Sequence, residues 1–248
     1  MKTLRNDILR KFAPIATILL VGLLCGSAAL AGTVDTCAVA GGGALTATNT
    51  VFPPACSAFG AGTLDAWMSA SFSYTSTAGT NTGTVYSAVY DNGGFLDFYY
   101  QVVNDPSSST ALARLIATDF AAFTTDVSFR TNGGSFTDPM CSLPSNQCFF
   151  DGTIAPQTSD SNTGGSVIGF GFNTPLVSGE ISPGEASNVV MISTNATMWD
   201  AGSASVIDGG SSGTLGAFQP TNVPEPASLG LLGLGLIGLA GLRRRLSR

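Results

Sequence analysis

Carboxylic acids are the most numerous charged groups in this chain that could do chemistry. Residues 32–222 hold fourteen of them against two cations, Arg114 and Arg130, which gives this part a net charge of −12. Two carboxylates at a suitable separation can hydrolyse a glycosidic bond. No spacing in the sequence singles out one such pair of carboxylates. We therefore expect that the protein is not an enzyme, with a two-carboxylate glycoside hydrolase as an alternative.

The residues that activate most nucleophiles are absent. The chain has no histidine, and residues 32–222 have no lysine. This excludes Ser-His-Asp and Cys-His catalysis, Schiff-base chemistry and a phosphate-binding lysine. A part with so few cations would also repel nucleic acid, because phosphate binding needs clustered positive charge. We therefore expect no nucleic-acid partner.

Calcium is the ion that the Asx- and Gly-rich turns could bind. Residues 91–94, together with Asp97, and residues 160–165 place carboxylate and amide oxygens beside glycines. Calcium takes six to eight such oxygens, but Asx residues in turns usually bond to their own backbone. We therefore expect no cofactor and no catalytic or metal-binding residue, with calcium binding as an alternative.

The first 31 residues are typical of a secretory signal peptide. A positively charged start precedes an apolar run at residues 15–24, and Ala29 and Ala31 form a small-x-small signal peptidase site. The alternatives are an uncleaved anchor, for which the run is short, and a lipoprotein at Cys25, for which Leu24 is too large. We expect signal peptidase to remove residues 1–31 during export.

The remaining cysteines agree with export. An even number of cysteines in a secreted chain favours disulfides, and the absence of histidine and of a C-x-x-C pair argues against zinc. Four cysteines allow three pairings, of which we favour the two local ones, Cys37–Cys56 and Cys141–Cys148.

Residues 32–207 are predicted to form one mainly β domain. In residues 64–74 the alternation places Leu64, Ala66, Met68, Ala70, Phe72 and Tyr74 on one face. Residues 83–91 and 95–104 flank an Asp-Asn-Gly-Gly turn, the strongest hairpin signal in the chain. Residues 111–123 suit either a helix or a strand with a turn, and other strands are expected at residues 123–130, 148–154, 166–173, 188–196 and 204–207. The pattern predicts an antiparallel, jelly-roll-like β-sandwich.

The chain ends with a predicted tether and an apolar segment. Residues 208–222 are rich in Gly and Ser without an apolar period, which predicts a flexible linker. Residues 227–242 carry no charge and would span about 24 Å as a helix, which predicts a transmembrane segment. Arg243, Arg244 and Arg245, in the basic tail 243–248, would keep that end in the cytoplasm and the body outside the inner membrane.

The tetrapeptide Val223, Pro224, Glu225 and Pro226 lies directly before this segment. Prolines hold it extended, the form in which proteases bind peptides. With the Gly/Leu-rich span and the arginines, residues 223–248 resemble the PEP-CTERM sorting domain, also labelled the ice-binding protein C-terminal motif. The resemblance implies that an exosortase recognises Pro224, Glu225 and Pro226.

The resemblance also implies a place for the protein. PEP-CTERM proteins are Gram-negative surface proteins associated with exopolysaccharide and biofilm. We expect a precursor held transiently in the inner membrane with a periplasmic body, which later reaches the cell surface or extracellular matrix. A carbohydrate- or calcium-binding β-sandwich module is the alternative to this function.

Overall fold

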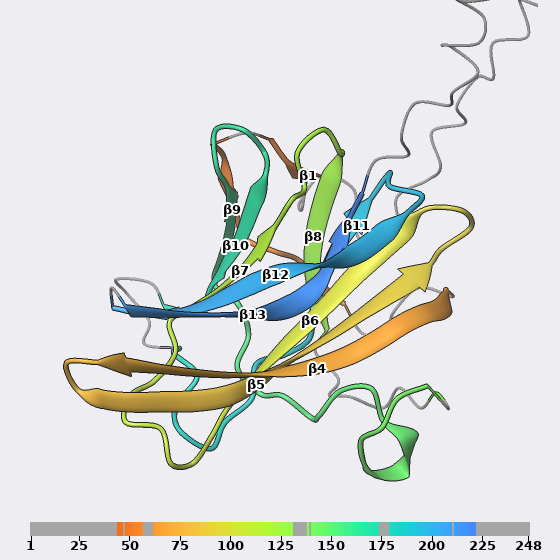
Figure 1. Ribbon diagram of the computed structural model, residues 1–248. Coiled ribbons are helices and arrows are strands. Elements are labelled where there is room, and N and C mark those ends of the chain that lie inside the picture. Colours follow the sequence, from red (N-terminus) through yellow and green to blue (C-terminus); the bar gives the residue numbers. More distant parts are fainter. Residues whose placement is uncertain are drawn as a thin grey trace, which may run out of the picture. The chain divides into compact units, whose positions relative to one another are not determined.

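The computed structural model describes residues 44–46, 48–56, 62–130, 138, 140–173, 179–209 and 211–221. The predicted signal peptide with Ala29 and Ala31, the sorting signal 223–248, and Cys37 lie outside these ranges. The described residues form a mainly β fold of two sheets (Figure 1). Within them, no helix is long and apolar enough to cross a membrane.

The first sheet carries the longest strands. Its neighbours are antiparallel along the order β4 (Thr63–Ser76), β5 (Gly79–Asp91), β6 (Leu96–Asn104), β11 (Val190–Thr194), β8 (Thr125–Arg130) and β1 (Ala44–Leu45). The two-residue strand β3 (Ala55–Cys56) pairs with β8 in parallel. The predicted hairpin is confirmed, because Asp91 pairs with Leu96 across a turn in which Gly93 and Gly94 have φ of 73° and 97°.

The second sheet is antiparallel throughout. Its order is β13 (Ser211–Pro220), β12 (Trp199–Asp208), β7 (Arg114–Thr118), β10 (Val167–Gly171), β9 (Thr158–Ser161) and β2 (Thr50–Val51). The ambiguous segment 111–123 is therefore a strand, β7, followed by a turn. A short 3-10 helix, Pro144–Asn146, lies in the loop before β9.

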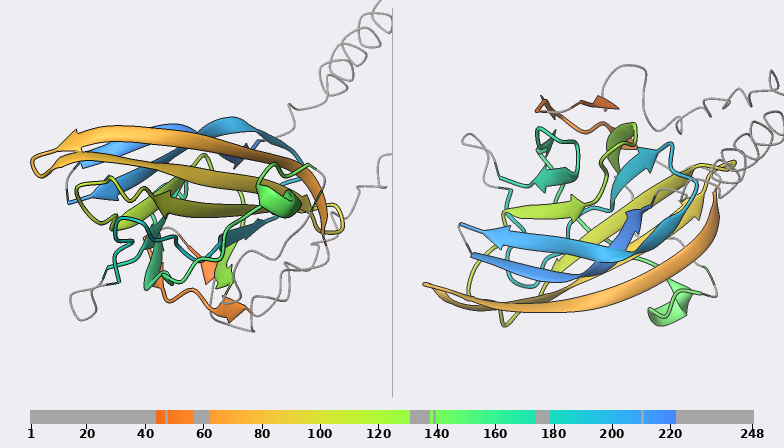
Figure 2. Two further views of the ribbon diagram at one scale, coloured as in Figure 1. Left: turned by 90° about the horizontal axis from the view of Figure 1, so that it is seen from below. Right: turned by 45° about the horizontal axis from the view of Figure 1, so that its top comes forward.

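One hydrophobic core joins the two sheets. Phe98 and Tyr100 of the first sheet and Leu115, Phe170 and Val206 of the second are fully buried in the same cluster. Figure 2 shows the β12–β13 hairpin lying across β4 and β5, and β13 contacts both strands. Alternate side chains therefore meet between the layers, as the predicted period of two requires.

A second, smaller cluster covers the opposite face of the first sheet. Tyr90, Tyr99 and Met191 point there, and the segment that carries Cys141 and Cys148 packs over them. Leu64 also belongs to this cluster, so its predicted place on the face of Ala66 and Phe72 is wrong. The register of β4 against β5 shifts between Leu64 and Ala66, and this bulge reverses the alternation.

The strand predicted at residues 148–154 is also wrong. The backbone of Phe150 pairs with a side chain instead, because the Gln101 amide donates to its carbonyl and accepts from its N–H, both at 2.8 Å. Ile154 makes one isolated bridge, to Ser187. The buried Gln101 side chain thus makes the hydrogen bonds to the Phe150 N–H and carbonyl that a neighbouring strand would otherwise make.

The flexible linker predicted at residues 208–222 is replaced by strand β13, which pairs with β12 along its whole length. Its inward positions include Gly213, Leu215 and Ala217, while Ser212 and Thr214 are exposed. The period of two was hidden because one inward position is a glycine. The folded body therefore extends beyond residue 207, to Thr221.

Candidate functional site

The sorting signal leaves the body from a fixed point at the end of β13. The motif residues Val223, Pro224, Glu225 and Pro226, and the anchor residues Arg243, Arg244 and Arg245, lie outside the described residues. Immediately before them, the Thr221 N–H donates to the Met198 carbonyl at 3.0 Å. The chain is thus hydrogen-bonded to the body as far as Thr221.

Side chains of the first sheet hold the end of β13. The Tyr100 hydroxyl, fully buried, donates to the Phe218 carbonyl at 2.6 Å, and the Phe218 N–H donates to the Ser87 hydroxyl at 3.2 Å. Burial raises the pKa of Tyr100, so this hydroxyl stays protonated and can donate. These bonds cross from one sheet to the other and fix the exit of the chain.

Large apolar side chains surround this exit. Met198 is 42% exposed and Trp199 is 36% exposed. Trp199 lies opposite Pro220, and its ring packs edge-on against Phe218 with the ring centroids 4.9 Å apart.

An acid lies beside the indole. Burial raises the pKa of Asp65, the charge of Asp91 adds to the rise, and the nearby polar N–H of Trp199 opposes it. The bulge in β4 places Asp65 at this end of the sheet, so sequence alternation alone could not have located it.

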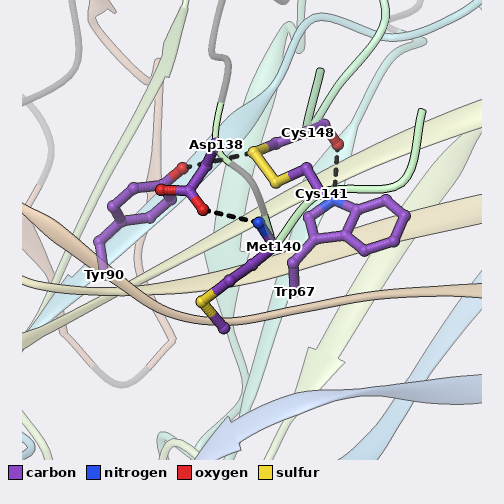
Figure 3. Close-up of a disulfide and its surroundings, with 6 residues drawn as sticks. All are labelled: Trp67, Tyr90, Asp138, Met140, Cys141 and Cys148. Atoms are coloured by element: carbon purple, nitrogen blue, oxygen red, sulfur yellow. Dashed lines mark hydrogen bonds between the residues drawn. A yellow bond between two sulfur atoms is a disulfide. The ribbon is translucent and has the colours of Figure 1, made fainter. Parts of the chain in front are cut away.

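The predicted disulfide Cys141–Cys148 is confirmed, with its Cα atoms 4.8 Å apart. Figure 3 shows Trp67 and Tyr90 beside it: the Trp67 indole donates to the Cys148 carbonyl at 2.7 Å, and the Tyr90 hydroxyl donates to the Cys148 sulfur at 3.8 Å. Cys56 is also disulfide-bonded. Its pairing with Cys37 stays a prediction.

The acids of the two candidate calcium stretches bond within the protein. Both carboxylate oxygens of Asp160 accept hydrogen bonds from Arg114, at 2.5 and 2.7 Å. In the other stretch, Asp91 accepts from the Gly94 N–H at 2.6 Å and Asp97 accepts from the Asn92 amide at 3.3 Å. Within the described part of the chain, no three Asp, Glu, His or Cys residues are placed to hold a metal ion.

Two acids meet at an open pocket of about 370 Å³. Asp151 and Glu185 line it, together with Val103, Phe150, Thr153, Gly184 and Ala186. Glu185 also accepts a hydrogen bond from the Ser182 N–H at 2.9 Å. No sequence pattern could have paired these acids, because strands β9 and β10 lie between them along the chain.

Comparison with known proteins identifies the segment that follows the exit. A family model described as the PEP-CTERM protein-sorting motif matches residues 222–245. No curated protein and no solved structure matches the chain. The chain thus carries a PEP-CTERM protein-sorting motif, which begins at the residue after Thr221.

Proposed function

We propose that this chain is an exported surface protein whose precursor an exosortase processes, and that its body is a non-enzymatic component of an exopolysaccharide-rich extracellular matrix. The sorting motif at residues 222–245 carries this proposal. Signal peptidase removes residues 1–31, residues 227–242 hold the precursor in the inner membrane, and the exosortase releases or transfers the body.

The properties of the body suit that place. The Cys141–Cys148 disulfide requires an oxidising compartment, which an exported domain reaches. The two sheets, joined by one core, fit a jelly-roll-like sandwich. The net charge of −12 on residues 32–222 keeps the body soluble and away from anionic surfaces.

The test is the sorting of the full-length precursor. Replacing Pro224, Glu225 and Pro226 with alanine should leave the precursor unprocessed in the inner membrane, as shown by cell fractionation and by the mass of the mature C-terminus. Glu180→Ala with Pro183→Ala changes the same residue types at exposed or half-buried positions of the body and should not alter processing. Unchanged mass and location in the triple variant would disprove the proposal.

The pocket of Asp151 and Glu185 favours glycan binding as a second candidate function. It joins two carboxylates to an aromatic ring, Phe150, and sugars are recognised by such polar groups beside apolar faces. Asp151→Asn with Glu185→Gln should then abolish retention on a glycan array or on matrix polysaccharide. Equal retention of the variant and the natural protein would remove this candidate.

A further inference from the structure

We propose that the exposed surface around the chain exit docks the membrane protease that processes the sorting signal. We call this surface the exit rim and define it as Met198, Trp199, Asp65 and Asp200. The inference rests on the proposed function, and it adds that the enzyme recognises the folded body together with the sorting motif.

The first argument is the length of chain outside the folded body. Thr221 is hydrogen-bonded to Met198, and Pro224 is three residues further along. An extended chain covers at most about 3.6 Å per residue, so Pro224 lies within about 11 Å of Thr221. An enzyme that binds Pro224, Glu225 and Pro226 must therefore contact the body surface next to Thr221.

The second argument is what that surface exposes. Met198 and Trp199 are two of the four large hydrophobic side chains exposed in the described residues, and they are adjacent in sequence. Trp199 is held by its edge contact with Phe218 and by the pairing of its backbone with Pro220. A rigid, partly exposed tryptophan is a residue type that dominates binding energy at protein interfaces.

The third argument is charge, which favours a protein over lipid. Asp65 and Asp200, the residue that follows Trp199 in β12, are exposed, and Asp91 lies close enough to raise the pKa of Asp65. Carboxylates beside an indole are repelled by anionic lipid headgroups. They complement a protein surface that has an apolar pocket flanked by lysine or arginine. Charge therefore favours a protein partner over lipid, and the short chain between Thr221 and Pro224 makes the processing enzyme that partner.

The experiment measures processing of the full-length precursor by pulse-chase in cells. Met198→Ser with Trp199→Ser should slow processing about tenfold, the effect of losing an aromatic anchor. Trp199→Phe, which keeps a ring, should retain most of the rate. Phe52→Ser serves as the control because Phe52 is 78% exposed and follows β2, at the opposite edge of the second sheet from β13.

A spacer separates docking from misfolding. With ten Gly/Ser residues inserted after Thr221, the tail can reach the enzyme without the body, so the rim substitutions should no longer change the rate. An equal slowing with and without the spacer would overturn the inference, because it would indicate a damaged body. Normal processing of the rim variant at native spacing would also overturn the inference. If that variant were processed normally but bound membranes less, the exit rim would be a lipid-binding surface instead.

The two proposals fail in different ways. If the alanine variant of Pro224, Glu225 and Pro226 is still processed, the proposed function is wrong. If processing depends on those residues and is indifferent to the exit rim, only the docking inference is wrong.

Discussion

The indole nitrogen of Trp67 donates to the carbonyl oxygen of Cys148, 81 residues further along the chain, at 2.7 Å. This bond ties the disulfide loop to the outer face of β4. Trp67→Phe should cost about 1–2 kcal/mol of unfolding free energy, because the Cys148 carbonyl loses its partner. Urea denaturation measures the loss.

The other tryptophan provides the matched control. Trp199→Phe removes the same group at a partly exposed position, so its cost should stay below about 0.5 kcal/mol. Similar losses for both variants would mean that the Trp67 bond contributes nothing specific.

The disulfide that this loop carries should itself stabilise the body. Its cysteines are seven residues apart, and the chain-entropy relation gives about 2.5 kcal/mol for closing so short a loop. Cys141→Ser with Cys148→Ser should lower the free energy of unfolding by that amount. Reducing the natural protein should cost more than this, because Cys56 is also disulfide-bonded. An unchanged free energy of unfolding in the double serine variant would contradict the prediction.

Two glycines of β13 test whether this segment is a strand. A Cβ at Gly213 would lie 2.8 Å from Cδ1 of Tyr74, whereas a Cβ at Gly216 would meet only Cε of Met68, at 3.4 Å. Gly213→Ala should therefore cost about 1–3 kcal/mol by overpacking. Gly216→Ala should be neutral or slightly stabilising, because glycine weakens a strand. Two neutral variants would point to a flexible segment.

Gly169 lets an ion pair cross a strand. Arg114 of β7 reaches Asp160 of β9 over the intervening β10, and a Cβ at Gly169 would lie 1.8 Å from Nη2 of Arg114. The pair is partly exposed, so Arg114→Ala should cost about 0.5–1 kcal/mol.

A double-mutant cycle tests that arrangement. Gly169→Ala should destabilise the natural protein and have almost no effect once Arg114 is alanine. Thermal melts of the four proteins measure the coupling. Additive effects would show that the two positions are independent.

Asp126 should make the body less stable as its carboxyl ionises. Burial raises its pKa above the 3.8 of an exposed aspartate, and its Oδ1 is buried without a hydrogen-bond partner. A raised folded pKa contributes stability that is present below the unfolded pKa and is lost as pH rises through the folded pKa.

Replacement of that carboxyl isolates its effect. Asp126→Asn should raise stability at pH 7 by about 1 kcal/mol, a low value because the side chain is only partly buried, and the gain should vanish near pH 3. Melts across that pH range measure it, with Asp119→Asn, at an exposed position, as the control. A gain that does not change with pH would exclude ionisation as its cause.

Local chemistry made most of the strands predictable. The turn at Asp91–Leu96, the alternation in β4 from Ala66 onward and the short spacing of Cys141 and Cys148 each act over a few residues. The hairpin, most of β4 and the disulfide follow from them. The sorting motif was equally accessible, because its residues are contiguous at positions 222–245.

The errors came from partners distant in sequence. Gln101 satisfies the backbone of Phe150, and the bulge at Asp65 moves Leu64 to another face. In β13 the inward Gly213 lies against Tyr74. Because glycine has no apolar side chain, a hydrophobicity pattern cannot identify this position as part of the core. The exit rim could not be predicted either, because it depends on a contact between distant residues. The pairing of Trp199 with Pro220 brings Trp199 next to the start of the sorting signal.

The position of β13 has a consequence for the order of events during synthesis. Its residues emerge from the ribosome after all the other strands that the structure describes. Leu215 and Ala217 nevertheless complete the shared core, and the Phe218 carbonyl accepts a hydrogen bond from the Tyr100 hydroxyl. The body cannot finish folding until the chain has grown as far as the sorting signal. A nascent chain that stalls before Ser211 would therefore lack both its last core strand and its address, which leaves it to the cell's proteases.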